Sequence, residues 1–232
     1  MKIGILECGH TIPDVVQEHG PLPTLFKRLL SDQGFEFAVY NIVDMQFPSS
    51  VEACDGWLLT GSRHGVYETH DFIPPLEEFV RAAFAAGRPM VGICFGHQII
   101  AQAFGGHVEK FSNGWSLGLT DYEFDALGPI RLNAWHQDQV IEAPQGATTI
   151  ARNDFCQHAA LLYGNKALTI QAHPEFNQDI MSSYVSARKG TADYPDALMD
   201  QVMERRALPD DNTRIADMMG AFFHQAWGAQ NV

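Results

Sequence analysis

The feature of this chain best suited to chemistry is a cysteine held between two glycines. Residues 92–98 read Gly-Ile-Cys-Phe-Gly-His-Gln, and Cys94 directly follows an apolar run that starts at Pro89. The run predicts a buried strand, and a helical pattern follows from His97 to Phe104. A strand, a sharp turn and a helix form a nucleophile elbow, whose glycines tolerate strained backbone and close approach of a substrate. Because the helix N-terminus favours a thiolate, the pattern predicts that Cys94 is a nucleophile.

A second motif lies far downstream of the cysteine. Residues 168–172 read Leu-Thr-Ile-Gln-Ala, which predicts another buried strand, and it runs into His173-Pro174-Glu175. A histidine at a strand end can serve as the general base for a thiol, and a carboxylate two residues later can orient its imidazole. Pro174 restricts the backbone between them. We therefore expect Cys94, His173 and Glu175 to form a catalytic triad.

These two motifs resemble those of the class I, triad-type glutamine amidotransferases, G-x-C-x-G-H-Q and Q-x-H-P-E. The resemblance covers roughly residues 3 to 176, and further landmarks follow in the family's order. Residues 58–62 (Leu-Leu-Thr-Gly-Ser) resemble its oxyanion loop, 135–138 (Trp-His-Gln-Asp) its His-x-Asp segment, and 156–160 (Cys-Gln-His-Ala-Ala) the stretch before its last catalytic strand. Within the family, the chain is similar to stand-alone members related to the glutaminase domain of GMP synthase and to plant γ-glutamyl peptidases.

The resemblance implies a reaction and a set of site residues. Cys94 would attack the γ-amide of glutamine, form a γ-glutamyl thioester, and release ammonia and then glutamate. The backbone N–H groups of Gly61 and Phe95 would form the oxyanion hole. The side chains expected to contact the substrate are Gln98, Trp115 and Ser116. The usual double glycine of the oxyanion loop is replaced here, since Thr60 precedes Gly61 and Ser62 follows it.

Two alternatives to a glutaminase stay open. The same triad would serve a stand-alone hydrolase of γ-glutamyl peptides or amines, because the thioester is the same whichever amine leaves. A non-catalytic binding module is the third reading, and the complete triad argues against it. A glutaminase would pass its ammonia to a synthase or acceptor subunit, since the chain has no phosphate-binding G-x-x-x-x-G-K-[ST] loop.

The order of predicted elements indicates an α/β fold of the flavodoxin-like, amidotransferase-like type. Strands and helices alternate along the first half, which predicts a mostly parallel central sheet with helices on both faces. A small β-rich addition is expected over 107–172. We expect one domain over residues 1–232, with 178–232 as a helical C-terminal extension packed on it. The individual elements predicted are strands at 3–6, 35–43, 57–60, 119–124 and 130–135 and helices at 22–33 and 76–86.

Composition narrows the classes of partner. The chain has 232 residues, 46% hydrophobic and 19% charged, with a formal net charge of −13, which argues against nucleic acid and anionic membranes as partners. The ten histidines include no His-Glu-x-x-His or comparable spacing, so we expect no cofactor and no metal, not even at His136 and Asp138. The start of the chain enters a strand at once, and Cys8, Cys54 and Cys156 are expected to be buried and inert, which together predict a cytoplasmic protein.

Overall fold

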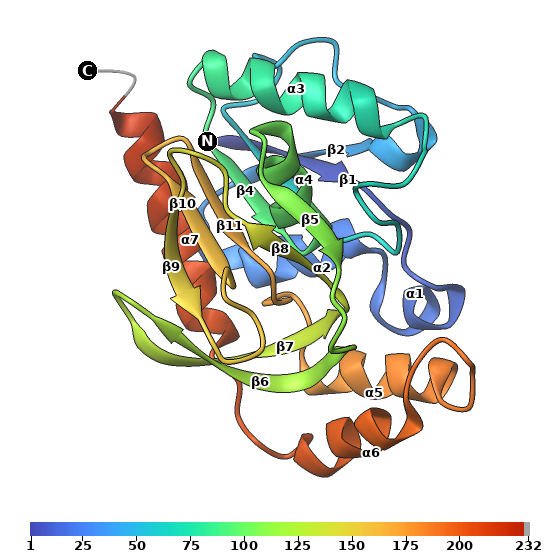
Figure 1. Ribbon diagram of the computed structural model, residues 1–232. Helices are drawn as coiled ribbons and strands as arrows, with labels where there is room; N and C mark the ends of the chain where they lie inside the picture. Colours follow the sequence, from blue (N-terminus) through green and yellow to red (C-terminus); the bar gives the residue numbers. More distant parts are fainter. Residues whose placement is uncertain (230–232) are drawn as a thin grey trace.

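The computed structural model describes residues 1–229 and has a nine-stranded sheet at its centre (Figure 1). The strand order is β2-β1-β3-β4-β11-β10-β9-β6-β7. The pairs from β2 to β11 are parallel, and the pairs from β11 to β7 are antiparallel. The strands of this sheet are β1 (Lys2–Glu7), β2 (Glu36–Asn41), β3 (Gly56–Leu59), β4 (Met90–Ile93), β6 (Ser116–Phe124), β7 (Gly128–His136), β9 (Thr148–Arg152), β10 (Ala160–Tyr163) and β11 (Ala167–Ile170).

The β-rich region joins the main sheet over most of its length. Strands β6, β7, β9 and β10 continue the parallel half as antiparallel neighbours, because short turns connect most of them. Only β5 (His107–Lys110) and β8 (Asp138–Glu142) form a separate two-stranded ribbon among the described residues. The expected α/β class is confirmed, and the sheet is more mixed than the alternation in the first half of the chain predicts.

Helices cover both faces of the sheet and create two main hydrophobic cores. On one face, Phe26 of α2 (Leu22–Leu29) packs with Met219 and Phe223 of α7 (Asn212–Gly228) over β1, β4 and β11. On the other face, Leu76 of α3 and Ile99 of α4 share a core with Trp57. The first four helices are α1 (Pro13–His19), α2 (Leu22–Leu29), α3 (Ile73–Ala85) and α4 (Phe95–Ala103).

Several boundaries differ from those predicted, each for a local reason. The helix expected over 22–33 ends at Leu29, and a 3-10 turn over Ser31–Gln33 leads to Gly34 in the left-handed conformation. The strand expected over 35–43 ends at Asn41, because a 3-10 turn buries Ile42 without extended backbone. The helix expected over 76–86 begins at Ile73, since prolines fit its first turn.

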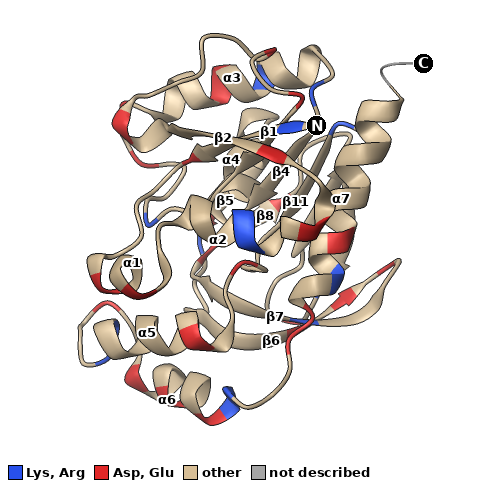
Figure 2. Cartoon of the chain, turned by 180° about the vertical axis from the view of Figure 1, so that it is seen from behind, with Lys and Arg blue, Asp and Glu red and all other residues tan. Residues whose placement is uncertain are grey.

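The C-terminal region is helical, as predicted, and its helices pack on the body. Helix α5 (Gln178–Arg188) contacts α1, α6 (Asp196–Arg205) contacts β6, and α7 (Asn212–Gly228) returns along the sheet (Figure 1). Figure 2 shows acidic residues on α1, α5 and α6. Within residues 1–229, no helix is both long enough and apolar enough to cross a membrane.

Candidate active site

Cys94 and the segment that carries His173 leave the sheet side by side. Strands β4 and β11 are parallel neighbours, and their last residues, Ile93 and Ile170, are paired in register. The backbone N–H of Cys94 donates a hydrogen bond of 2.9 Å to the carbonyl of Ile170. Adjacent strands that end together bring residues distant in sequence to one edge, as α/β folds do at their sites. The predicted meeting of the two motifs is therefore found in the structure.

The elbow has the strained backbone that its sequence predicts. Cys94 has φ of 53° and ψ of −102°, and it is one of two non-glycine residues with positive φ in residues 1–229. A side chain at either flanking glycine would collide with backbone. A Cβ on Gly92 would lie 2.5 Å from the carbonyl oxygen of Gly96, and one on Gly96 would lie 2.4 Å from that of Leu59. Strain of this kind persists only where the surroundings enforce it, and it clusters at functional sites.

His173 is fixed by its neighbours on three sides. Its Nδ1 is 2.7 Å from Oε1 of Glu175, and its backbone N–H donates to the carbonyl of Asn133 on β7 at 2.8 Å. The imidazole stacks on Phe176 with ring centres 4.3 Å apart, and the Asn133 side chain donates to the Phe176 carbonyl at 2.8 Å. Both His173 and Glu175 are 5% exposed. These contacts leave the imidazole little freedom to turn away from Cys94.

The electrostatics around His173 favour its charged form. Burial by itself lowers the pKa of His173, but the neighbouring Glu175 carboxylate and Cys94 outweigh burial and raise this pKa from 6.5 to about 10. An anion close to an imidazole stabilises the imidazolium, and the low polarity of the site strengthens the attraction. In the folded protein, His173 therefore carries a proton at neutral pH.

The loop after β3 brings Gly61 against both residues. A Cβ on Gly61 would lie 2.9 Å from Cε1 of His173 and 3.7 Å from Cβ of Cys94, so this position has no room for a side chain. Thr60 holds the loop, because its hydroxyl accepts from the Cys8 N–H at 3.0 Å and donates to the Gly61 carbonyl at 3.0 Å. Thr60 thus helps to orient the Gly61 peptide.

Phe95 occupies the first position of α4. The backbone N–H groups in a first helical turn have no acceptor within the helix. The next residue, Gly96, donates its N–H to the Thr60 carbonyl at 3.1 Å, which ties the start of the helix to the Gly61 loop. The two residues expected to supply the oxyanion donors, Gly61 and Phe95, therefore lie on two segments that this hydrogen bond joins.

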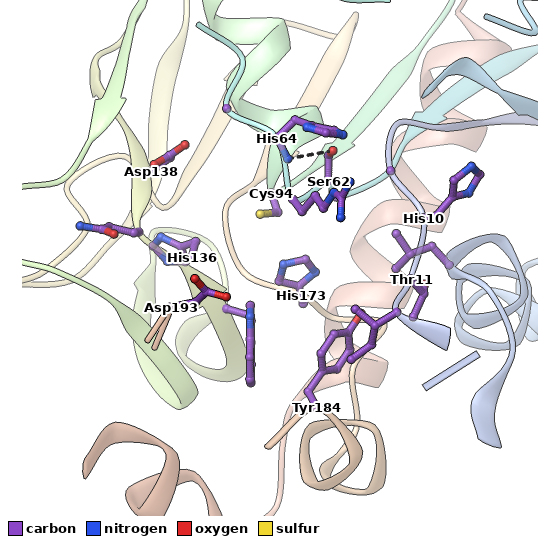
Figure 3. A pocket seen from close by; sticks show the side chains of 18 of the residues that line it. His10, Thr11, Ser62, His64, Cys94, His136, Asp138, His173, Tyr184 and Asp193 are labelled. Carbon is purple, nitrogen blue, oxygen red and sulfur yellow. Dashed lines mark hydrogen bonds between the residues drawn. The ribbon is translucent and has the colours of Figure 1, made fainter. Parts of the chain in front are cut away.

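Gly61, Cys94 and His173 line a cavity of about 710 Å³ at the ends of the parallel strands (Figure 3). This volume is within the range of about 300–1,000 Å³ that is usual for small-molecule sites. Loops after β1, β3 and β4 line one side, and the tail adds another wall. The lining residues from the tail are Tyr184, Arg188, Asp193 and Tyr194.

The three predicted substrate contacts lie in different positions relative to this cavity. Gln98 and Trp115 line it, whereas Ser116, the first residue of β6, is not among its lining residues. The side-chain amide of Gln98 donates to the Asp138 carbonyl at 2.8 Å and to Oε1 of Gln171 at 3.1 Å. Because its donors are used inside the protein, Gln98 would meet a ligand through its own oxygen.

The environment of His97 is that of a structural residue. It is fully buried, and its Nδ1 shares a hydrogen bond of 2.8 Å with the Thr169 hydroxyl on β11. Burial, followed by the nearby His136 and His158, lowers the pKa of His97 to about 3, so the ring is neutral. The three other cysteines are buried and free, and burial raises the pKa of Cys156 to about 12.

Some pocket residues were not predicted from the sequence. An aromatic wall forms where Tyr194 contacts Trp115 (4.7 Å between ring centres) and Trp135 (5.3 Å), and Trp135 in turn contacts Tyr184 (5.1 Å). The aromatic residues after 178 read as ordinary packing in a helical tail, so composition alone gave no signal. His64 and Glu68 also line the pocket, in the loop that follows Gly61.

Comparison with known proteins places this chain in a family. Residues 24–189 match the family described as glutamine amidotransferase class-I, and the chain belongs to it. Among curated proteins, γ-glutamyl peptidase 4 of Arabidopsis thaliana is 30% identical and aligns over 70% of this chain and 71% of its own length. One of the subunits of the glutamine-hydrolysing GMP synthase of Halobacterium salinarum is 28% identical over 74% of this chain and 96% of its own.

Solved structures support the fold. A glutamine amidotransferase from Methylobacillus flagellatus superposes with a TM-score of 0.76 over 97% of this chain and 94% of its own, at 20% sequence identity. At 20% identity, the similarity between the two structures concerns the fold alone, including the helical C-terminal region. The predicted α/β class and the predicted family are therefore both confirmed.

Proposed function

We propose that this protein is a thiol hydrolase of γ-glutamyl amides, with Cys94, His173 and Glu175 as its catalytic residues. The observation that carries the proposal is the 2.7 Å pair of His173 and Glu175 beside a cysteine held at positive φ in a pocket. Members of the family include glutamine amidotransferases and γ-glutamyl peptidases, which share this type of substrate bond.

The first half-reaction forms the thioester. The raised pKa of His173 favours a thiolate–imidazolium pair with Cys94. The thiolate attacks the γ-carbonyl carbon, and the carbonyl oxygen becomes an oxyanion that the N–H groups of Gly61 and Phe95 stabilise. Each such donor typically contributes about 3–4 kcal/mol to the transition state. When the C–N bond breaks, His173 gives its proton to the leaving amine, and the γ-glutamyl group stays on sulfur.

The second half-reaction regenerates the thiol enzyme. Neutral His173 takes a proton from water, which attacks the thioester carbon through a second oxyanion. The carbon–sulfur bond then breaks, glutamate leaves, and the proton on the imidazole restores the starting pair. Glu175 keeps the imidazole in the tautomer whose Nε2 can serve in both steps.

The pocket favours γ-glutamyl peptides or amines over glutamine as the substrates. The cavity of about 710 Å³ is larger than one amino acid fills, and its lining includes Trp115, Trp135 and Tyr194, which are in ring contact. A leaving group larger than ammonia would occupy this space and contact the aromatic rings. This preference reverses the order expected from the sequence, in which glutamine came first and a synthase or acceptor subunit was the expected partner.

Glutamate release from the purified chain tests the proposal. Glutamine and a panel of γ-glutamyl peptides and amines are compared, with Cys94→Ala as the blank. We expect release from at least one peptide or amine to exceed release from glutamine, and no release in the variant. Slow release confined to glutamine would favour a glutaminase subunit that needs a synthase. No Cys94-dependent release from any compound would favour the non-catalytic binding module.

A further inference from the structure

The loop between β3 and α3 gathers three metal-binding side chains at the rim of the pocket. His64, Glu68 and His70 place one donor atom each within 4.8 Å of the others. Oε2 of Glu68 is 2.8 Å from Nε2 of His70 and 3.8 Å from Nδ1 of His64. Within residues 1–229, no other group of three histidine, cysteine or acidic side chains is arranged in this way. We call these three residues the rim cluster.

Backbone hydrogen bonds and an aromatic ring hold the rim cluster in shape. Glu68 donates its N–H to the Gly65 carbonyl at 3.0 Å, and His70 donates to the Glu68 carbonyl at 3.2 Å. The rings of His64 and His70 are 4.1 Å apart, and each has its centre 5.8 Å from that of the buried Phe72. The donors are therefore brought together by the fold before any ligand arrives.

We propose that His64, Glu68 and His70 bind one divalent transition-metal ion of the zinc type. Two imidazoles and one carboxylate are a donor set that zinc uses in proteins, whereas magnesium and calcium prefer oxygen throughout. Tetrahedral coordination at zinc distances needs donor atoms about 3.4 Å apart, and the separations of 2.8 Å and 3.8 Å lie on either side of that value. The third separation, between the donor atoms of His64 and His70, is within 4.8 Å.

The position of the ion links it to the candidate active site. His64 and Glu68 line the cavity that contains Cys94, and the His64 N–H donates to the Ser62 hydroxyl at 3.2 Å, one residue after Gly61. Phe72, which supports both imidazoles, also contacts Phe95 with ring centres 5.9 Å apart. An ion at the rim cluster would narrow the pocket mouth and restrain the loop that carries Gly61, so we expect it to inhibit.

No metal was expected from the sequence because the spacing, His-x-x-x-Glu-x-His, is not that of a helical zinc motif. The residues meet through turns, since the segment 61–72 contains no helix or strand. Proximity of this kind depends on the fold of the loop and is visible only in three dimensions.

Binding is tested on the full chain with Cys94→Ser, so that the thiolate cannot hold the ion. Titration with Zn²⁺ in a calorimeter and the visible absorption of bound Co²⁺ report stoichiometry and ligand type. We expect one ion per chain, with affinity at least tenfold weaker when His70→Ala is added. His107→Ala is the matched control, because His107 has a single acidic partner, Glu109 at 3.2 Å, in an exposed pair. Equal affinity with and without His70 would overturn the proposal.

A second variant protects the test against misfolding. Glu68→Gln keeps the shape of an exposed side chain and removes the charge that a cation needs. We expect it to weaken binding at least tenfold while the unfolding midpoint stays close to that of the parent, and unchanged binding would also overturn the site.

The inhibitory effect is measured separately, with the natural Cys94. Zinc can inhibit by binding the Cys94 thiol as well as by binding the rim cluster. Only the inhibition through the rim cluster depends on His70. We expect His70→Ala to need several-fold more Zn²⁺ for half inhibition than His107→Ala. If both variants were equally sensitive to Zn²⁺ in a chain shown to bind the ion at the rim cluster, the bound ion would not affect catalysis.

Discussion

His173 and Glu175 make unequal contributions to the proposed reaction. His173 moves the proton in both half-reactions, whereas Glu175 acts through its 2.7 Å contact with the ring. Stacking on Phe176 and the backbone bond to Asn133 would still orient the ring without the carboxylate. We expect His173→Ala to lower kcat/KM by roughly 10³-fold or more, and Glu175→Ala by about tenfold less than that. Glutamate release by both folded variants measures the difference, and a larger loss in Glu175→Ala would contradict it.

The same pair predicts how stability depends on pH. Although burial opposes it, Glu175 and Cys94 raise the pKa of His173 from 6.5 to about 10, so the folded protein holds this proton more tightly than the unfolded chain does. The stabilisation is complete below pH 6.5 and is lost as pH rises through about 10. We expect the free energy of unfolding to fall across that window, and to fall less in Glu175→Gln. Urea unfolding at several pH values measures both slopes, and parallel slopes would refute the assignment.

Gly61 has a steric reason to lack a side chain. A methyl group there would lie 2.9 Å from Cε1 of His173 and would push the imidazole away from Cys94. Since a misplacement of about 1 Å can cost roughly 10²-fold in rate, we expect Gly61→Ala to lose about that much in kcat with the fold kept. Gly228→Ala is the control, because a Cβ at Gly228 meets nothing within 4 Å. Equal activity of the two variants would show that the contact is easily relieved.

At the level of elements, local patterns predicted most of what positions Cys94. The run before Cys94, the flanking glycines and the helix after it are adjacent in sequence, so their periodicity and turn chemistry suffice. The anchoring of His173 by Asn133 joins segments 40 residues apart, and no local pattern encodes it. The loop 61–72 is similar, because its turns bring His64, Glu68 and His70 together without regular spacing. In the β-rich region, the pairs β6–β9 and β5–β8 likewise join strands that are distant in sequence.

The segment between α5 and α6 allows a test of the proposal that the substrate has a leaving group larger than ammonia. Tyr194 lies in this segment and contacts both Trp115 and Trp135 on the pocket wall. Because such aromatic contacts are worth about 0.5–1.5 kcal/mol, we expect Tyr194→Ala to raise KM for a bulky γ-glutamyl amide by several-fold and to leave glutamine turnover nearly unchanged. Phe222→Ala on α7, outside the pocket lining, is the control. Equal effects on both substrates would place the leaving group elsewhere.

For the whole molecule, α7 contributes more to folding than to the site. Its Ile215, Met219 and Phe223 are fully buried against the parallel strands. Burying each contributes about 1.5–3 kcal/mol, so the three together approach the total stability of about 5–15 kcal/mol typical of a domain. We expect a chain ending at residue 189, where the family match ends, to fail to fold cooperatively. Thermal unfolding beside full-length Met219→Ala, expected to lose about 2–5 kcal/mol, checks this; a cooperative, soluble 1–189 fragment would contradict it.

The place of β11 in the middle of the sheet has a consequence for how the chain is made. Strand β4 is complete at Ile93, but its neighbour β11 begins only at Ala167, so one side of β4 has no partner while the ribosome produces everything between. An open strand edge of apolar residues is a template for pairing with other chains. Until β11 is made and pairs with β4, the nascent chain exposes the unpaired edge of β4 and also lacks His173. Completion of the candidate active site and protection against aggregation would then both depend on one late step, the insertion of β11 beside β4.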